Sequence, residues 1–258
     1  MFRRPRQTEA DRLTKKLSET LHPIDVIPWA NVAMWYLGVP ICVGAPMMVV
    51  RDDDYAAAIE KFERAGFTKS APNRTPCPEI MDDHPDPQRL MEEINAGYTR
   101  VDRYCTVLNY PQDDPEQKGA QLYLFPDSFA HIFPDSRNAS IALGGTASTN
   151  RFHTYGNLHY PLEPVLVESF VKAAIDEETE MVFSDWAEIL ACWVSLMSGY
   201  LEVNNDILDH CEDEKAVEWY SVNFGRIYEA KNGPMDRRIS KRLGSGKEMP
   251  VDMRGNPI

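Results

Sequence analysis

The side chains most able to do chemistry are scattered along the chain, and none has the spacing of a known catalytic motif. No two histidines stand four residues apart, and none belongs to an HExxH sequence. Imidazole nitrogen and carboxylate oxygen suit transition metals, but histidines in predicted loops more often have solvated or structural roles. We therefore predict no resident metal ion. The histidines are His22, His84, His131, His153, His159 and His210.

Nucleophiles also lack a recognised local sequence. The chain has no GxSxG and no GxGxxG, and Gly144-Gly145-Thr146 lacks the Gly-Lys-Ser/Thr ending of a P-loop. Cys192 and Ser198 lie in the most apolar predicted helix, where packing explains them better than catalysis. We expect the large aromatic residues of the same half to be core residues as well, namely Trp186, Trp193, Trp219 and Tyr220.

A run of aspartates offers a more specific alternative. Asp52-Asp53-Asp54 follows an apolar run, and we expect it to cap the next helix and to place negative charge in its first turn. In the alternative, Asp52 and Asp54, which have DxD spacing, are metal ligands. They would join Asp102, near a later strand, as the catalytic acids that hold Mg²⁺ and a nucleotide triphosphate.

The elements that must position these residues alternate in type through the first half. Residues 7–21 and 29–37 predict two helices, and the apolar run 41–50, interrupted by glycine and proline, predicts two short buried strands. A helix with one apolar face follows the aspartates and ends at Gly66.

The next segment is rich in proline over residues 70–87, which predicts a loop. A short helix over 88–96 and strands over 104–109 and 121–125 follow. Residues 136–150 predict irregular structure.

The second half predicts helices. Pro164 suits the first turn of one helix, and Asp185 with Glu188 resembles a capping box for a second. A third is expected from Asp213 to Asn232, where a Gly-Pro pair follows.

The predicted fold class is thus mixed α/β, with a small mixed sheet flanked by helices and followed by a helical module. We expect three kinds of region: an α/β core over 22–135, a helical module over 160–232, and polar basic ends over 1–21 and 233–258.

Charge limits the class of partner. The net charge is −13, and residues 21–230 alone carry −20. An acidic region of this kind repels phosphate backbones, which argues against nucleic-acid binding and leaves a protein or a small molecule as the partner.

The cysteines and the hydropathy indicate the compartment. Five widely spaced cysteines without a CxxC pair favour reduced thiols, and Met1 is followed by no apolar signal segment. The longest uncharged apolar stretch, 189–201, is too short to cross a membrane. We therefore expect a cytoplasmic protein that does not enter the membrane.

Several short motifs together resemble a known superfamily. The chain is similar to a group of fungal proteins with the nucleotidyltransferase-like fold. The resemblance is carried by Trp35–Pro40, Val43-Gly44, Met48–Val50, the helix over 56–67, Leu122–Pro126, Tyr155–Leu158, Tyr160-Pro161, Trp219 and Asn223–Arg226. It implies a small mixed sheet with flanking helices, followed by a helical module.

The same resemblance locates the acids that catalysis would need. Active members place two carboxylates at i and i+2 on a strand, after a Gly-Ser turn, so that both lie on one face and hold two divalent ions. With the strand ending at Met48–Val50, those positions are Ala45 and Met47, and Val43-Gly44-Ala45 provides no Gly-Ser turn.

The leading hypothesis is therefore a binding or accessory protein with degenerate catalytic positions, without a cofactor. One alternative is an active nucleotidyl- or phosphotransferase that uses Asp52, Asp54 and Asp102 with Mg²⁺ and a nucleotide triphosphate. The other is a structural protein that binds a partner through its helical half.

Overall fold

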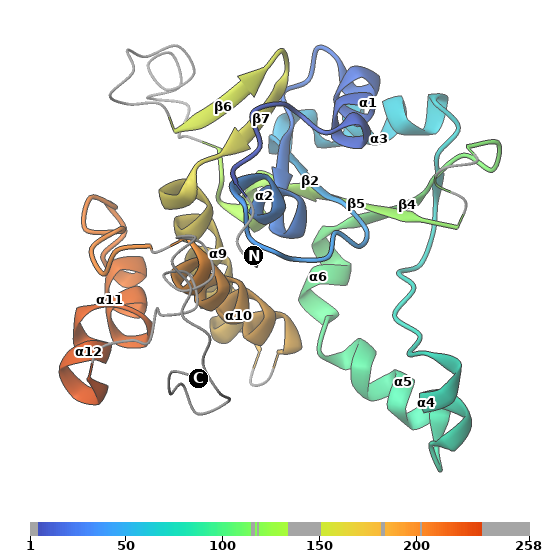
Figure 1. The fold of residues 1–258 in the computed structure, drawn as a ribbon. Coiled ribbons are helices and arrows are strands. Elements are labelled where there is room, and N and C mark those ends of the chain that lie inside the picture. Colours follow the sequence, from blue (N-terminus) through green and yellow to red (C-terminus); the bar gives the residue numbers. More distant parts are fainter. Residues whose placement is uncertain are drawn as a thin grey trace, which may run out of the picture.

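The structure is a computed structural model that describes residues 5–114, 117, 119–133, 151–181, 184–201 and 203–233 (Figure 1). The irregular stretch expected over 136–150 and nearly all of the basic end expected over 233–258 lie outside these residues. Within them, helices and strands alternate through the first half, and helices dominate the second.

A small mixed sheet forms the centre of the fold, so the predicted mixed α/β class is confirmed. Its strand order is β1-β2-β5-β4-β3; β2 and β5 run parallel, and the other neighbours are antiparallel. The strands are β1 (Ile27–Trp29), β2 (Met47–Val50), β3 (Thr68–Lys69), β4 (Thr106–Asn109) and β5 (Gln121–Pro126).

Strands β4 and β5 confirm the two strands predicted there, to within a few residues, but the run 41–50 forms one strand rather than two. Pairing starts only at Met47. Pro46 has no N–H to donate, although its carbonyl accepts a bond of 3.0 Å from Tyr123 N.

A second, two-stranded sheet was not predicted. It is a hairpin of β6 (Phe152–Tyr155) and β7 (Leu158–Pro161) that turns at Gly156, where φ is +66°. Its residue Leu158 also bridges to Val26, just before β1. The hairpin therefore adjoins the edge of the main sheet.

Helices of the first half cover the sheet. They are α1 (Arg12–Leu21), α2 (Ala30–Leu37), α3 (Asp52–Arg64), α6 (Thr99–Tyr104) and α7 (Asp127–Ala130). Helix α1 begins later than expected and buries Leu17 and Leu21, so this part of the basic end over 1–21 belongs to the core. The predicted end of α3 at Gly66 is confirmed, with φ of +90°.

The start of α3 corrects one prediction. The three aspartates do occupy the first turn, but the N-cap is Arg51, and none of the aspartates caps this helix with its side chain. The side chain of Asp52 accepts hydrogen bonds from Ser128 instead. It therefore ties α3 to α7.

The segment expected as a loop over 70–87 contains a helix. Two helices, α4 (Pro78–Asp83) and α5 (Pro87–Ala96), stand away from the sheet at the lower right of Figure 1. Proline starts both helices, and it suits a first turn because the N–H it lacks has no partner inside the helix there.

The second half is helical, as predicted, with α9 (Glu163–Glu180), α10 (Asp185–Tyr200), α11 (Glu214–Asn223) and α12 (Arg226–Asn232). Ser184, not Asp185, caps α10 with its side chain. The third predicted helix is broken at Gly225. A Cβ there would come within 2.8 Å of Ser221 Cα and 3.0 Å of Asn205 O, so this close approach needs glycine.

One continuous core joins the two halves. Trp29, at the end of β1, is fully buried, and its ring lies 5.3 Å from Phe125 of β5, 5.8 Å from Phe170 of α9 and 6.1 Å from Trp186 of α10. Its indole N–H donates to Ser169 Oγ at 2.9 Å. The sheet and the helical half therefore pack against the same aromatic residue.

Among the helices that the structure describes, none is long and apolar enough to cross a membrane.

Candidate functional site: an aromatic pocket at the start of β2

A pocket of about 250 Å³ opens between the start of β2, the neighbouring strand β5, helix α6 and helix α10. Its wall is mostly aromatic and aliphatic. The lining residues are Asn31, Ala45, Met47, Arg74, Tyr98, Val101, Tyr123, Phe125, Trp186, Ile189 and Trp193.

The strand pair supplies the floor of the pocket. Ala45 and Met47 are two residues apart, and Met47 lies directly opposite Tyr123 in the parallel register. Side chains two residues apart along a strand share a face. Phe125 therefore lies on the same face as Tyr123. The two positions at which the superfamily resemblance expects metal-binding acids are thus in the wall of a pocket, and they are apolar.

Helix α10 supplies the opposite wall. Trp186 and Trp193 meet edge to face at 5.3 Å, and Trp186 stacks on Phe125 at 6.4 Å. Trp186 is buried, as predicted. Trp193 packs against the core, as predicted, but it is only half-buried and also lines the pocket. The reason is helical spacing: Trp186, Leu190 and Val194 face the core, and Trp193 lies at the border of that face.

Trp219 shows the same pattern elsewhere. It is half-buried, lines an open groove between α9 and α11, and donates its indole N–H to Glu178 at 3.1 Å. The neighbouring Tyr220 is buried, as predicted.

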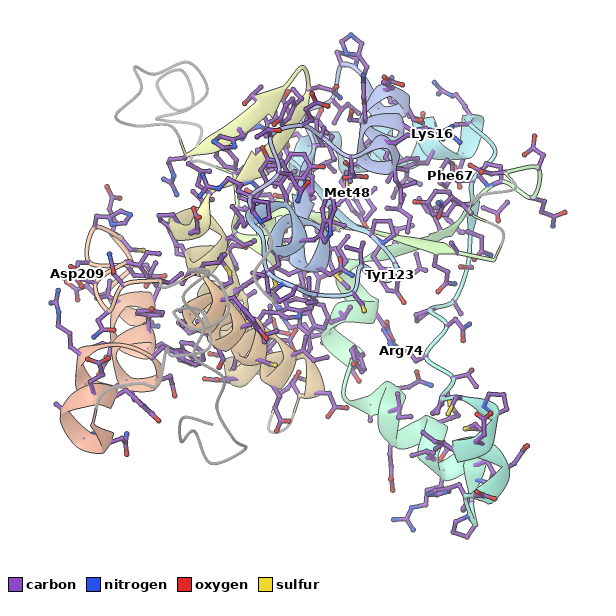
Figure 2. All side chains as sticks on the ribbon, in the orientation of Figure 1. Lys16, Met48, Phe67, Arg74, Tyr123 and Asp209 are labelled. Atoms are coloured by element: carbon purple, nitrogen blue, oxygen red, sulfur yellow. The ribbon has the colours of Figure 1, made fainter. Side chains whose placement is uncertain are left out.

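An arginine clasp closes the pocket on the side of α6. Arg74 donates two hydrogen bonds to the Asp102 carboxylate, at 2.8 and 2.5 Å, and lies over the Tyr98 ring at 4.2 Å. Figure 2 shows Arg74 on the segment that runs from the sheet down to α4, with Tyr123 on the sheet above it. Because Asp102 neutralises the guanidinium, the clasp adds little free positive charge to the pocket.

Burial sets the protonation of the polar groups in this wall. Burial disfavours the charged form of Arg74, but the hydrogen bonds and charge of Asp102 outweigh it, so its pKa is raised. Burial likewise raises the pKa of Tyr98 and of Tyr123, against the opposing charge of Arg74. Both phenols are therefore protonated at neutral pH.

Two polar atoms in the lining residues have no partner. Asn31 Oδ1 and Trp186 Nε1 are buried and make no hydrogen bond within the described residues. Asn31 follows Ala30, which has a left-handed φ of +54° that alanine rarely adopts. Strain and unsatisfied polar atoms concentrate at functional sites. Neighbouring protein atoms cover both of these polar atoms.

The opposite end of the same strand pair carries carboxylates. Asp52 follows β2 and Asp127 follows β5, and the two strands end together because they are parallel. Asp127 Oδ1 accepts from the N–H groups of Ile132 and Phe133 at 2.8 and 2.9 Å. Burial raises the pKa of Asp127, although these backbone bonds oppose the shift and Asp52 adds to it. Sequence reasoning did not single out Asp127.

The three acids of the alternative hypothesis do not form one cluster, because each has a different place or partner in the fold. Asp52 binds Ser128, Asp54 lies in the first turn of α3, and Asp102 pairs with Arg74 from helix α6 rather than from a strand. Over the ranges described above, no three His, Cys, Asp or Glu side chains form a group that could hold a metal ion.

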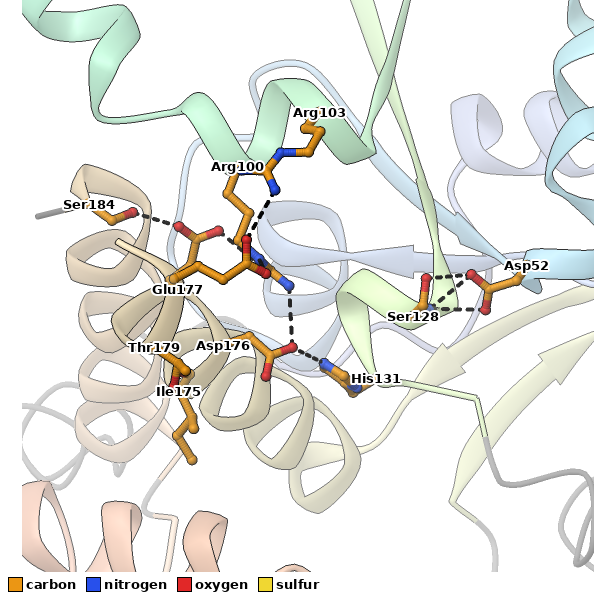
Figure 3. Close-up of polar contacts among 11 residues, drawn as sticks. Asp52, Arg100, Arg103, Ser128, His131, Ile175, Asp176, Glu177, Thr179 and Ser184 are labelled. Carbon is orange, nitrogen blue, oxygen red and sulfur yellow. Dashed lines mark hydrogen bonds and ion pairs between the residues drawn. The ribbon is translucent and has the colours of Figure 1, made fainter. Parts of the chain in front are cut away.

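A buried arginine links α6 to α9. Arg100 is 2% exposed and donates to Glu177 at 3.1 Å, to Glu180 at 3.0 Å and to Asp176 at 3.3 Å (Figure 3). Ser184 Oγ donates to Glu177 at 2.8 Å. This buried charge is therefore fully paired and fixes one wall of the site.

The remaining sequence candidates are dispersed. Cys192 is exposed, which corrects its assignment to packing, whereas Ser198 is buried. His131 bonds Asp176 at 2.8 Å, and His159 bonds Asp25 at 3.2 Å. None of these residues lines the aromatic pocket.

Sequence reasoning located only one part of the pocket. Ala45 and Met47 were singled out because the superfamily resemblance places its catalytic acids there, whereas Asn31, Arg74 and Tyr123 were not singled out as site residues. They come from three separate segments that meet only in the fold.

In comparisons with known proteins, no family model, curated protein or solved structure matches the chain. The resemblance to the nucleotidyltransferase-like superfamily and to its fungal members therefore stays a prediction.

Proposed function

We propose that this chain is a binding protein that holds a small, flat, uncharged aromatic molecule in the pocket at the start of β2, within a nucleotidyltransferase-like core whose catalytic positions are degenerate. One observation carries the proposal. Ala45 and Met47, where that superfamily would place metal-binding acids, line an aromatic pocket together with Tyr123 of the adjacent strand. An apolar pocket with a few polar groups is the usual form of a small-molecule site.

The size and charge of the pocket define the ligand class. Its volume of about 250 Å³ exceeds the roughly 150 Å³ of an engineered apolar cavity that holds benzene, so one substituted ring or two fused rings fit. Arg74 is already paired with Asp102, which removes the reason for the site to select an anion. Trp186 and Trp193 offer edges and faces for stacking.

Metal-dependent nucleotidyl transfer is not supported by the same residues. Two divalent ions need several carboxylates close together, and the lining residues of this pocket include none. Asp52 and Asp54 lie in the first turn of α3, where carboxylates interact favourably with the N–H groups of the helix.

We also expect a cytoplasmic protein, because all five cysteines are free.

Titration of tryptophan fluorescence tests the proposal. The probes are indole, which has only a hydrogen-bond donor, quinoline, which has only an acceptor, and isoquinolone, which has both. We expect isoquinolone to bind about tenfold more tightly than the other two, since each added hydrogen bond contributes about 0.5–1.5 kcal/mol. The parallel probe is ATP with Mg²⁺.

Two matched variants locate the binding site. Ala45→Leu fills the pocket and is expected to weaken isoquinolone binding about tenfold or more, whereas Ala57→Leu, at an exposed position on α3, leaves it unchanged. Equal effects of the two variants would remove the pocket from the proposal. Binding of ATP that depends on Mg²⁺ and is lost in Asp52→Asn would replace the proposal with the transferase alternative.

A further inference from the structure

The helical arm, which we define as residues 77–96 with α4 and α5, buries none of its helical residues although it forms two helices. It stands away from the rest of the molecule (Figure 1). Among the described residues, the one hydrogen bond that joins the arm to a residue distant in sequence is Arg74 Nη1 to Asn95 Oδ1, at 3.4 Å. The arm therefore contributes little to the core of the fold.

The arm nevertheless carries apolar side chains at helical spacing. Leu90, Met91 and Ile94 share one face of α5, and Ile80 of α4 is 52% exposed. The three residues of α5 and Met81 are only half-buried. An amphipathic face of this kind is normally covered by another element, whereas each of these side chains stays at least partly exposed among the described residues.

The charge of the arm indicates what can cover it. Residues 77–96 contain six carboxylates and one arginine, and that arginine, Arg89, is already paired with Glu93 at 2.8 Å. The same arm of a second copy would bring the same negative charge, and so would an anionic membrane or a nucleic acid. A positively charged protein segment is the complementary occupant.

We propose that the arm docks a basic amphipathic helix of a partner protein, which lays its apolar face on Ile80, Leu90, Met91 and Ile94 while its lysines and arginines meet the surrounding carboxylates. The helix-in-groove mode of recognition uses the same combination of spaced apolar anchors and flanking charge. The inference is independent of the pocket, since none of the arm's residues lines it.

Fluorescence anisotropy with two synthetic peptides tests this assignment on the full chain. Both have 18 residues, half leucine and half lysine; in one the leucines share a helix face, and in the other the same residues are scrambled. At 150 mM salt we expect the amphipathic peptide to bind at least about tenfold more tightly than the scrambled one. Equal affinities would mean attraction by charge alone and would overturn the proposal.

Variants decide whether the peptide sits on the arm. Ile80→Ser is expected to weaken the binding of the amphipathic peptide about fivefold or more. Val222→Ser, at a 40% exposed position on α11, is expected to leave the binding unchanged. Because Ile80→Ser can also loosen α4, Asp82→Asn with Asp83→Asn provides a second test at exposed positions. Glu60→Gln with Glu63→Gln on α3 is its matched control.

The two substitutions on the arm are expected to weaken the binding of the amphipathic peptide about threefold or more, and the two substitutions on α3 are expected to leave it unchanged. An equal effect of both pairs would overturn the assignment to the arm. Sedimentation velocity tests whether a second copy of the chain covers this face instead. Self-association of the parent chain that is lost in Ile80→Ser would show this and would overturn the proposal.

Discussion

The two ends of the β2–β5 strand pair treat their polar groups differently. At the end where the strands finish, Asp52 accepts from Ser128, and Asp127 accepts from two backbone N–H groups. At the end where β2 begins, Asn31 Oδ1 and Trp186 Nε1 are buried beside an aromatic pocket and have no hydrogen-bond partner in the part of the chain that the structure describes. The carboxylates at the first end are hydrogen-bonded within the protein, whereas these two polar atoms at the second end are not.

This difference separates structural acids from a binding site. Buried polar atoms in folded proteins are nearly always hydrogen-bonded, so an exception requires a physical reason. A ligand that supplies the missing partners is such a reason. The comparison also explains why an acidic run in the sequence is a poor guide here: the carboxylates lie where the backbone needs acceptors, and the cavity lies elsewhere.

The largest expected effect comes from the most completely paired group in the structure. Arg100→Met leaves Glu177 buried without its partner, and we expect a loss of about 3–5 kcal/mol in the free energy of unfolding, measured with urea. Arg103→Met, which removes an exposed pairing with Glu180, is the control and should cost less than about 1 kcal/mol. Similar losses for both would mean that burial does not distinguish the two arginines.

At the acidic end, Asp127→Ala removes the acceptor for the N–H groups of Ile132 and Phe133. We expect a loss of about 1–3 kcal/mol by urea unfolding, because those donors lose their partner. A variant as stable as the parent would show that water replaces Asp127 freely, and the contrast between the two ends would disappear.

A smaller loss is expected for the neighbouring acid. Asp52→Ala removes the acceptor for Ser128 at the start of α7 and should cost about 0.5–2 kcal/mol, as the loss of a helix cap does. Asp53→Ala, at the adjacent exposed position, is the control and should cost less. Equal small costs would show that the link between α3 and α7 contributes nothing.

The pH dependence of Asp127 gives the smallest effect. Burial raises its pKa above the ordinary 3.8, so the folded state favours the protonated acid, and this contribution to stability is lost as pH rises from about 3.8 through the raised value. Asparagine retains the acceptor and has no charge to lose. The stability of Asp127→Asn relative to the parent should therefore rise between pH 3 and pH 7 in thermal unfolding. A gain that shrinks as pH rises would contradict this sign.

The sequence predicted elements whose signals are local. Helix α3 shows them together: apolar residues on one face, acids in the first turn and Gly66 at its end. Strand β1 could not be predicted in this way, because it has three residues and includes Pro28, which only an edge strand tolerates. The strands of the β6–β7 hairpin are also short, with four residues in each.

The candidate site was predictable only in part, for a related reason. Ala45 and Met47 follow from the superfamily resemblance, and strand alternation, which is a local rule, places the two on one face. Arg74 depends on Asp102 and Tyr98, from beyond the arm, and Trp193 depends on how α10 faces the sheet. Long-range packing decides these contacts, and no spacing in the sequence records it.

The most direct test of the central claim compares two buried indole N–H groups. Trp29 Nε1 donates to Ser169 Oγ, whereas Trp186 Nε1 has no hydrogen-bond partner among the described residues. The measurement is the free energy of urea unfolding of Trp29→Phe and Trp186→Phe, with isoquinolone titrated into the folded Trp186→Phe variant.

We predict that Trp29→Phe costs about 1 kcal/mol more than Trp186→Phe, because only Trp29→Phe removes a hydrogen bond of the protein, the one that the indole N–H donates to Ser169 Oγ. We also predict that Trp186→Phe weakens the binding of isoquinolone about tenfold. Equal losses of stability, or unchanged binding by Trp186→Phe, would contradict the claim that this end of the strand pair is completed by a ligand.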